Sequence, residues 1–435
     1  MPISNGAPRN ALRALVVAGC AVAGLVGIQT ASSAVANTPP GTYAYVTDSS
    51  SGQVTVINTA TNSVTATIGV GSAPLGVAVS GDGKRVYVTN SLSNTVSVID
   101  ATTDTVIATV MVGSNPQAVA LSPDGKQAFV ANDGSGTVSV IDTATDSVVK
   151  SFAVGAHPEG VTFSPDGTRA YVTNTASNNV SVVDTAADAT VATVSTGTTP
   201  VGVAVTPDGS HVWVADAGDG TISIIATSDH SVASISLGGS PYGVAVSGDG
   251  NAVYVTDRFG NELRVISAAT HAVTASIATG QTPQQVALTP DGSQAYIADL
   301  SDGAVSVINL ATRSAGTPIV VGTGPLGLAI GTIVQAPTTL TAGNGHLSLL
   351  PLGATGLNAT LTSNGAPLAG QTIAFTADDG TPLCRAVTNA SGYATCNAVP
   401  PILTTVSVLL GGYQATFAGS VYDKPSTAHG SLSLL

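Results

Sequence analysis

Polar and aromatic side chains interrupt this otherwise repetitive chain at two kinds of place. The first place is beside a recurring proline, where other copies of the segment carry glycine or small and aliphatic residues. The second is the loop after a recurring aromatic strand, which also contains Asp133 and Asp219. A mixture of carboxylate, amide, imidazole, guanidinium and aromatic groups can bind a partner, and arginine and tyrosine often dominate such contacts. The candidate binding residues are Gln117, His157, Glu159, Tyr242, Arg258, Phe259, Glu262, Gln284 and Gln285.

Acid–base chemistry is an alternative use of these residues. His157 and Glu159 flank one proline and could serve as the acid and base of a hydrolase or lyase. No third group accompanies them, and the sequence shows no Ser-His-Asp, metal-ligand or phosphate-loop spacing. We therefore predict a binding protein rather than an enzyme, with no catalytic residue, metal or cofactor. Ordinary variation in solvent-exposed loops would produce the same departures, and the sequence leaves that interpretation open.

A repeat of about 42 residues positions these candidates. Each copy contains a proline-initiated apolar strand, a turn of the type Ser/Thr-Pro-Asp-Gly, an aromatic strand and two further strands of alternating pattern. In the turn, proline presets φ, aspartate bonds the backbone and glycine accepts a positive φ. Four strands per repeat of this length are typical of a propeller blade. The aromatic residue recurs in steps of 41 or 42 residues, at Tyr45, Tyr87, Phe129, Tyr171, Trp213, Tyr254 and Tyr296.

The number of copies predicts seven blades and the way in which the ring closes. Proline-initiated strands begin at residues 74, 116, 158, 200, 241, 283 and 325. The first copy lacks such a strand, and the last one, Pro325–Ile330, is supernumerary. We expect it to join the first three strands in a composite blade, which leaves no open edge. The chain is thus predicted to be all-β, with a seven-bladed β-propeller over residues 42–333.

The motifs YVTN at 87–90 and 171–174 and VSVID at 96–100 and 138–142 resemble the YVTN family of bacterial β-propeller repeats, found in surface-layer and secreted proteins. The resemblance implies that the first strand of each blade lines a central channel and that the candidate residues lie on one rim of it. Lactonase-like and lyase-like propellers hold a metal or acid–base groups at that channel. The channel strands here, such as GVAV and AVAL, contain no Asp, Glu, His, Cys or Lys.

A repeated acidic position raises the question of a metal. The aromatic strand ends in Asp or Asn in every copy, and Asp216, Asp257, Asp299 and Asp48 fall on consecutive blades of a closed ring. Calcium requires several oxygen ligands at about 2.4 Å, and carboxylates on different blades are too far apart to supply them. Capping of the following turn explains the preference for Asp and Asn, so we predict no metal there.

The repeat stops near residue 337, and residues 338–422 are predicted to form a small β-sandwich. The segment GQTIAFTADDGTPLCRAVTNASGYATC is similar to bacterial Ig-like domains of surface proteins, in which such a hairpin often carries a cysteine pair. Cys384 and Cys396 are expected to form a disulfide between strands that the Asn389–Gly392 turn brings side by side. We assign no fold to the tail, 423–435. The expected strands are 359–363, 371–376, 393–396, 405–410 and 413–417.

The N-terminus predicts an exported protein. Arg9 and Arg13 precede the apolar run 14–28, and Ala34-Val35-Ala36 is a signal-peptidase pattern, so residues 1–36 are expected to be a removed signal peptide. Alternatively, residues 17–20 resemble a lipobox that would leave a lipidated Cys20. Cleavage after Ala36 changes the net charge from −13 to 10 − 25 = −15, which disfavours nucleic acid as a partner. No later segment is long enough to span a membrane.

These observations predict a secreted or cell-envelope protein whose rim binds a protein or glycan partner. A structural envelope protein without a discrete ligand is a further alternative, because surface-layer relatives of the repeat have that role.

Overall fold

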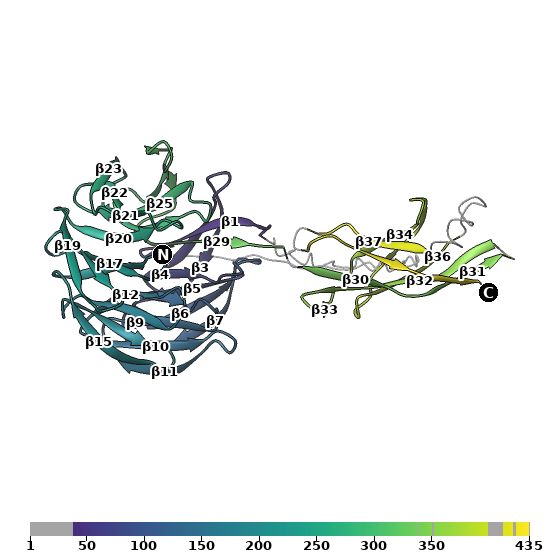
Figure 1. Ribbon diagram of the computed structural model, residues 1–435, viewed down its shortest axis with the longest axis horizontal. Helices are drawn as coiled ribbons and strands as arrows, with labels where there is room; N and C mark the ends of the chain where they lie inside the picture. The colour runs from purple at the N-terminus through teal and green to yellow at the C-terminus, as the bar shows by residue number, and fades with distance from the viewer. Residues whose placement is uncertain (1–37, 336, 350–351, 399–411, 421–422, 435) are drawn as a thin grey trace, which may run out of the picture. The chain divides into compact units, whose positions relative to one another are not determined.

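The computed structural model describes residues 38–335, 337–349, 352–398, 412–420 and 423–434. The expected signal peptide, with Cys20, and the strand expected at 405–410 lie outside these residues. The described residues form strands and turns (Figure 1), and no helix among them could cross a membrane.

Residues 41–333, the repeat region, form seven antiparallel sheets, each built mainly from one copy of the repeat. The first strands are β4 (Pro74–Val79), β8 (Pro116–Leu121), β12 (Pro158–Phe163), β16 (Pro200–Val205), β20 (Pro241–Val246), β24 (Pro283–Leu288) and β29 (Pro325–Ile333). The second strands are β1 (Gly41–Asp48), β5 (Arg85–Asn90), β9 (Gln127–Asn132), β13 (Arg169–Asn174), β17 (His211–Asp216), β21 (Ala252–Asp257) and β25 (Gln294–Asp299).

Two further strands complete each sheet. The third strands are β2 (Gln53–Asn58), β6 (Thr95–Asp100), β10 (Thr137–Asp142), β14 (Asn179–Asp184), β18 (Thr221–Ala226), β22 (Glu262–Ser267) and β26 (Ala304–Asn309). The outer strands are β3 (Ser63–Gly69), β7 (Thr105–Met111), β11 (Ser147–Ala153), β15 (Ala189–Ser195), β19 (Val232–Ser236), β23 (Val273–Ala278) and the short pair β27 (Ser314–Ala315) and β28 (Ile319–Val320), which both join β26.

The first strands contact one another in a closed series, β4, β8, β12, β16, β20, β24 and β29, and β29 returns to β4. β29 also pairs antiparallel with β1, so that Tyr45 faces Ala329 in one sheet (Figure 1). The last strand of the repeat region therefore completes the first sheet, as the surplus proline-initiated strand predicted. This pairing leaves β1 without an open edge.

Threonine hydroxyls on the second strands join neighbouring sheets. The register of each proline-initiated strand shifts after the proline, as between Pro74 and Val77 in β4. Thr89 Oγ1 accepts a hydrogen bond from the Gly76 N–H (2.8 Å) and donates one to the Gln117 carbonyl of the next sheet (2.6 Å). The threonine of the YVTN motif therefore satisfies the backbone beside the bulge and fixes the next sheet. The same pair of bonds is made by Thr47, Thr173 and Thr256.

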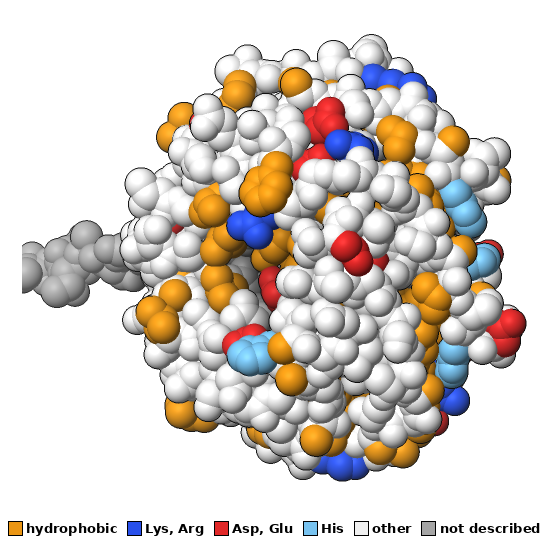
Figure 2. All heavy atoms as spheres, turned by 90° about the vertical axis from the view of Figure 1, so that its left-hand side faces the viewer, with side chains coloured by type: hydrophobic (Ala, Val, Ile, Leu, Met, Phe, Trp, Pro, Cys, Tyr) orange, Lys and Arg blue, Asp and Glu red, His pale blue; other side chains and the backbone are white. Residues whose placement is uncertain are grey.

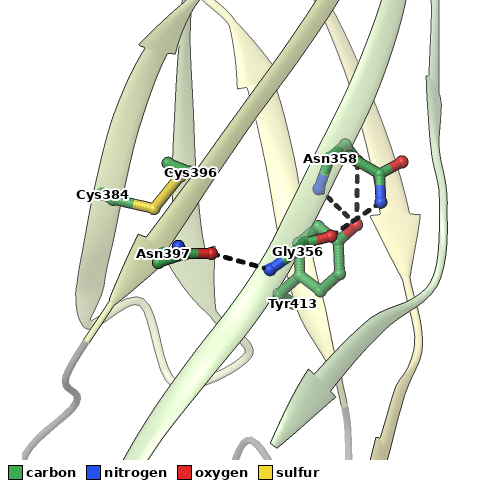
Figure 3. Close-up of a disulfide and its surroundings, with 6 residues drawn as sticks. All are labelled: Gly356, Asn358, Cys384, Cys396, Asn397 and Tyr413. Atoms are coloured by element: carbon green, nitrogen blue, oxygen red, sulfur yellow. Dashed lines mark hydrogen bonds between the residues drawn. A yellow bond between two sulfur atoms is a disulfide. The ribbon is translucent and has the colours of Figure 1, made fainter.

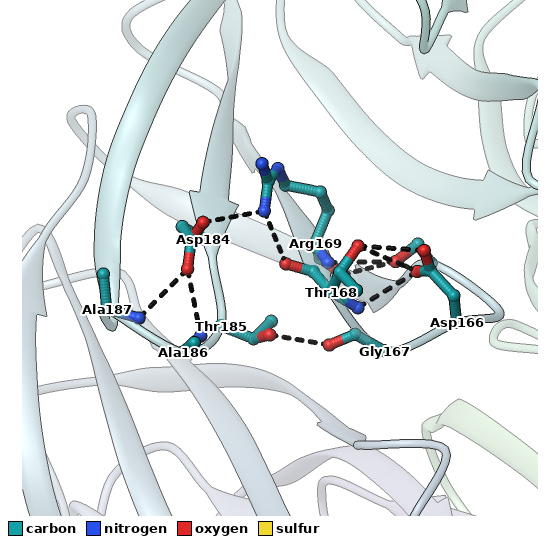
Figure 4. Close-up of polar contacts among 9 residues, drawn as sticks. Asp166, Gly167, Thr168, Arg169, Asp184, Thr185, Ala186 and Ala187 are labelled. Atoms are coloured by element: carbon teal, nitrogen blue, oxygen red, sulfur yellow. Dashed lines mark hydrogen bonds and ion pairs between the residues drawn. The ribbon is translucent and has the colours of Figure 1, made fainter.

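Figure 4 shows a turn that joins a first strand to its second strand. The Asp166 carboxylate accepts hydrogen bonds from Ser164 Oγ (2.5 Å) and the Thr168 N–H (3.0 Å), while Gly167 has a φ of 72°. Thr185 Oγ1 donates to the Gly167 carbonyl (2.6 Å). The hydrogen bond from Ser164 is the largest cause of a lowered Asp166 pKa. The recurring aspartate is thus engaged by its own turn.

The C-terminal module consists of two sheets around one hydrophobic core. Leu357 and Leu361 of one sheet and Phe375 and Phe417 of the other are buried in that core. The first sheet contains β30 (Thr338–Ala342), β31 (Gly345–Leu349), β32 (Leu352–Ser363), β33 (Ala366–Pro367), β36 (Tyr393–Ala398) and β39 (Leu432–Leu434). The second contains β34 (Thr372–Ala377), β35 (Pro382–Val387), β37 (Tyr413–Phe417) and β38 (Ser426–Gly430).

The expectation that the tail has no fold is wrong for the residues described there. β38 pairs antiparallel with β37, and β39 pairs parallel with β31. The sequence STAHG of β38 lacks an apolar alternation, because most of this strand is exposed or half-buried. Backbone pairing rather than side-chain burial holds it in the sheet.

Cys384 and Cys396 form the expected disulfide, with a Cα–Cα distance of 6.4 Å (Figure 3). The two strands lie close together, as expected, but they do not pair with each other in one hairpin. β35 carries Cys384 and pairs with β34, whereas β36 carries Cys396 and pairs with β32 in the other sheet. The Asn389–Gly392 turn therefore carries the chain from one sheet to the other, and the disulfide links the two layers.

Candidate functional site

The first strands of the sheets surround a cavity of about 180 Å³, which we call the channel cavity. Most of its lining is glycine, alanine, valine or leucine. Figure 2 shows a hollow near the middle of one face of the repeat region, with acidic, basic and hydrophobic side chains around it. The polar side chains of the lining are Gln117, Glu159, Tyr242 and Gln285.

Strand geometry places these side chains. In most sheets the residue after the buried proline lines the channel cavity, and the next position is usually glycine. Glycine is needed there because the backbone of the next sheet is close: a Cβ on Gly202 would lie 2.1 Å from the Tyr242 carbonyl oxygen. Six of the residues after proline line the cavity, three of them aliphatic (Leu75, Val201 and Leu326) and three polar (Gln117, Glu159 and Tyr242). Leu326 and Leu75 come from the neighbouring strands β29 and β4, whereas Val201 of β16 lies between Glu159 and Tyr242 in the closed series.

Glu159 and Tyr242 come from β12 and β20 and meet in the cavity. The Tyr242 hydroxyl donates a hydrogen bond of 2.8 Å to Glu159 Oε1. Burial raises the pKa of Glu159, and the hydrogen bond from Tyr242 opposes this shift. Burial, together with the Glu159 charge, also raises the pKa of Tyr242. Glu159 Oε2 makes no hydrogen bond within the described part of the chain, so one carboxylate oxygen is held and the other is free.

Arg258 and Phe259 lie in the loop after β21. The Arg258 guanidinium stacks on the Tyr242 ring, with its Cζ 4.4 Å from the ring centroid. Its N–H groups have no hydrogen-bond acceptor among the residues that the structure describes. Phe259 is 80% exposed. The loop is held by Asp257 Oδ1, which accepts from the N–H groups of Phe259 (3.1 Å) and Gly260 (3.0 Å).

His157 lies outside the lining of the channel cavity. Its Nδ1 is 3.0 Å from Asp133 Oδ1, and Asp133 Oδ2 accepts from Asn115 Nδ2 (2.8 Å). Asn115 Oδ1 accepts in turn from Gln117 Nε2 (3.2 Å). A polar chain therefore connects the cavity to the surface loops of two sheets. His157 makes no hydrogen bond to Glu159, so the structure does not join the acid–base pair considered from the sequence.

Gln284 and Glu262 are engaged by other parts of the chain and do not line the cavity. The prediction that Gln284 lies on the rim is wrong, because it is fully buried and its amide nitrogen donates to the Thr282 carbonyl (3.0 Å). Gln285, which stands where other sheets carry glycine or alanine, lines the cavity instead. Glu262 forms an ion pair with Arg264 (2.9 Å) and does not contribute to the lining.

Sequence reasoning missed two residues near the rim. Asn115, which bridges Gln117 and Asp133, precedes a proline like His157, and this shared position was the available signal. Leu92 is 77% exposed and occupies the same loop position as Phe259, two residues after the end of the second strand. Asp219, in contrast, joins its own loop to the preceding β15–β16 loop by accepting from the Thr198 N–H (2.9 Å).

The Asp and Asn residues that end the second strands make separate contacts within their own sheets. Asn90 Nδ2 donates to Ser97 Oγ (3.0 Å), and Asp216 Oδ2 accepts from Ser223 Oγ (2.7 Å). Burial raises the pKa of Asp216, and likewise that of Asp299, to about 6. The described residues contain no cluster of three His, Cys, Asp or Glu that could hold a metal.

Comparison with known proteins supports the fold. Residues 9–134 match the YNCE-like beta-propeller family, whose name fits the repeated four-stranded sheets. The chain is a β-propeller protein. Residues 133–281 of the propeller protein match the choice-of-anchor I domain, which points to a secreted or surface protein. Neither match is to the YVTN family and neither reaches the C-terminal module, so the YVTN and Ig-like assignments stay predictions.

Solved structures resemble the propeller protein over most of their own length. Hydrazine synthase of Kuenenia stuttgartiensis is 27% identical, covers 61% of this chain and 92% of its own, and has a TM-score of 0.58. A functionally unknown protein from Desulfotomaculum acetoxidans is 18% identical, with coverages of 66% and 98% and a TM-score of 0.60.

A third structure, a dihydro-heme d1 dehydrogenase, is 17% identical, with coverages of 66% and 74% and a TM-score of 0.51. At these identities the last two structures show the fold alone. A search of curated protein sequences gave no match.

Proposed function

We propose that this propeller protein is secreted or held in the cell envelope and that the mouth of its channel cavity binds a protein or glycan partner. In this proposal the seven sheets are the blades of one YVTN-type propeller, and the C-terminal module is an Ig-like sandwich that acts as a spacer or contacts a second surface. The expected signal peptide and the choice-of-anchor match support the compartment. The net charge of −13 argues against nucleic acid as the partner.

One observation carries the proposal: unsatisfied binding groups gather at one mouth. Glu159 offers a free carboxylate oxygen, Arg258 offers stacked N–H donors, and Phe259 exposes an aromatic ring. Other copies of the repeat carry none of these groups at the equivalent positions. Stacked arginine and aromatic side chains are the types that contribute most at interfaces, and a partner would pair the polar groups that the chain itself leaves unpaired.

The test is capture of a partner from the envelope fraction of the producing organism. The mature protein is compared with a mouth variant, Glu159→Ala, Tyr242→Ala and Arg258→Ala, and with a control variant, Lys84→Ala, Lys126→Ala and His211→Ala. Lys84 and Lys126 lie in the turns at the opposite ends of the first strands, and His211 is the first residue of β17, directly after such a turn. All three proteins are first shown to unfold at similar temperatures.

Capture by the parent and the control, but not by the mouth variant, is the expected result. Equal capture by all three proteins would contradict the choice of this mouth and direct attention to the C-terminal module. If the parent captures nothing, the structural envelope role becomes the better explanation.

A hydrolase or lyase is the second candidate, and one observation favours it. Burial raises the pKa of Glu159 inside a cavity, which suits a carboxyl group that acts as a general acid or base. His157, held by Asp133, would not take part in that chemistry. Turnover of lactones or p-nitrophenyl esters by the parent, abolished by Glu159→Gln, would support it. No turnover by the parent would eliminate this candidate for those substrate classes.

A further inference from the structure

The channel cavity combines an aliphatic wall with one charge. Glu159 is the single ionisable carboxyl group in its lining as described, and no lysine, arginine or histidine lines it. Leu326 and Leu75, from the neighbouring strands β29 and β4, supply the aliphatic wall, and Val201 adds an aliphatic side chain between Glu159 and Tyr242. Arg258 stacks on the ring of Tyr242, outside the lining; its charge opposes the rise of the Glu159 pKa but does not outweigh the effect of burial.

We propose that the channel cavity binds a primary alkylammonium group, with the ammonium on Glu159 and the alkyl chain along Leu75, Val201 and Leu326. This inference rests on the proposed function and adds the chemistry of the ligand. Lysine side chains of a partner protein and free alkylamines share that chemistry. The cavity, at about 180 Å³, is smaller than the roughly 300–1,000 Å³ typical of sites for drug-sized molecules, which suits one side chain or one small amine.

The free oxygen of Glu159 is the reason to prefer a cation. A neutral apolar ligand would remove water from Oε2 and leave it without a donor, which is unfavourable for a carboxylate. An anion would meet the same carboxylate and be repelled. An ammonium group supplies three donors, and the side-chain oxygens of Gln117 and Gln285 in the lining are additional acceptors.

The electrostatics of the whole chain favour the same ligand. A net charge of −13 attracts cations over a distance and raises their rate of encounter. Burial raises the pKa of Glu159, and a bound cation would reverse this shift by stabilising the ionised carboxylate. Ligand binding and the protonation of Glu159 are therefore expected to be linked.

The experiment measures binding of defined probes to the mature protein by calorimetry at low ionic strength and pH 7.5. Acetyl-Gly-Lys-Gly-amide represents a protein lysine, n-butylammonium represents a free amine, and the Nε-acetylated peptide is the neutral control. The variant is Glu159→Gln. Its matched control is Glu262→Gln, because Glu262 is the other glutamate of the chain and lies outside the cavity.

We expect at least one charged probe to bind at least tenfold more tightly than the Nε-acetylated peptide. Glu159→Gln should weaken that binding at least tenfold, and Glu262→Gln should change it less than twofold. A peptide that binds more tightly than n-butylammonium indicates a protein lysine; the reverse indicates a free amine. If Glu159→Gln does not fold, the pKa of Glu159 measured by NMR in the parent serves instead, and it should fall when the probe is added.

Equal binding of the charged and Nε-acetylated peptides, unchanged binding by Glu159→Gln, or no saturable binding of either charged probe would overturn the inference. Partner capture separates this failure from failure of the proposed function. If the mouth variant loses capture although neither charged probe binds or competes, the alkylammonium chemistry is wrong and the binding mouth stands. If capture does not depend on the mouth, both proposals fail.

Discussion

Replacement of Asp216 by asparagine is expected to stabilise the propeller at neutral pH. Asp216 is fully buried, its Oδ2 accepts from Ser223 Oγ at 2.7 Å, and its Oδ1 has no hydrogen-bond partner. Asparagine occupies the equivalent position in other sheets, where Asn90 both donates to Ser97 Oγ (3.0 Å) and accepts from the Gly71 N–H (3.0 Å). The Asp216→Asn side chain should therefore fit without rearrangement of the backbone.

The magnitude follows from the pKa of Asp216, which burial raises from 3.8 to about 6. A difference of about two pKa units, at 1.36 kcal/mol per unit, corresponds to a destabilisation of about 3 kcal/mol by the ionised form. Because the native state binds the proton more tightly, stability falls as pH rises from 3.8 toward 6 and stays reduced above that. The gain from Asp216→Asn should thus be largest above pH 6 and vanish below about pH 4.

The assay is urea unfolding of the parent and the variant at several values between pH 3.5 and 8, followed by tryptophan fluorescence, since Trp213 lies on the same strand, β17. The reverse substitution, Asn174→Asp, is the control and should destabilise the protein above pH 6. A gain that does not depend on pH, or a loss of stability for Asp216→Asn at pH 7, would refute the electrostatic reasoning.

Three further predictions concern other parts of the chain. Thr89→Val removes the hydroxyl that bonds both Gly76 and Gln117 and should lower the free energy of unfolding by about 1–3 kcal/mol. Chemical denaturation measures this loss, with Thr55→Val as the control. Equal losses for the two variants would argue against a special role of the Thr89 bonds between sheets. Asp208→Asn should lower the melting temperature at pH 7 but not near pH 2. The hydrogen bond from Thr206 is the largest cause that lowers the Asp208 pKa to about 2, so the stabilising effect of the carboxylate is present above pH 3.8 and is lost as the pH falls toward 2. A difference in melting temperature that persists at pH 2 would contradict this. Replacing both cysteines by serine should destabilise the C-terminal module by about 3 kcal/mol while leaving the transition of the repeat region unchanged in calorimetry; a shift of both transitions would show that the two parts unfold together.

Much of the repeat region could be predicted from the sequence because its strands carry a regular signal. The proline that begins each first strand and the aromatic residue that centres each second strand recur together, so Pro74 and Tyr87 define a sheet that the other copies reproduce. The pairing of the strand at Pro325 with β1 was predictable for the same reason. The first copy of the repeat lacks a proline-initiated strand, and the last copy supplies one too many.

The cavity contacts could not be predicted, because they join residues far apart in the chain. Tyr242 and Glu159 are 83 positions apart, and nothing in either segment specifies the angle between their sheets. Gln284 and Gln285 are neighbours of the same type, yet one is fully buried and the other lines the cavity. Strand periodicity predicts that the two side chains point in opposite directions. It does not predict which of them faces the cavity, because the bulge after the proline shifts the register.

The two errors in the C-terminal module fall where the sequence carries no signal for the placement of a strand. β38 is held mainly by its backbone bonds to β37, which leave no apolar pattern in the sequence. The turn at Asn389–Gly392 gave the right proximity of the cysteines, but a turn alone does not specify whether the following strand stays in the same sheet or enters the opposite one.

The pairing of β29 with β1 has a consequence for the order in which the chain acquires its structure. Tyr45 and Ala329 face each other although they are 329 − 45 = 284 residues apart, so the first sheet cannot be completed until the last repeat has been synthesised. Contacts of such long sequence separation form slowly, because the intervening loop must be ordered first. The second to seventh sheets are each contiguous in the chain and can form early. Maturation therefore ends with the first sheet, whose exposed edge is the part of the nascent protein most open to aggregation or to a chaperone.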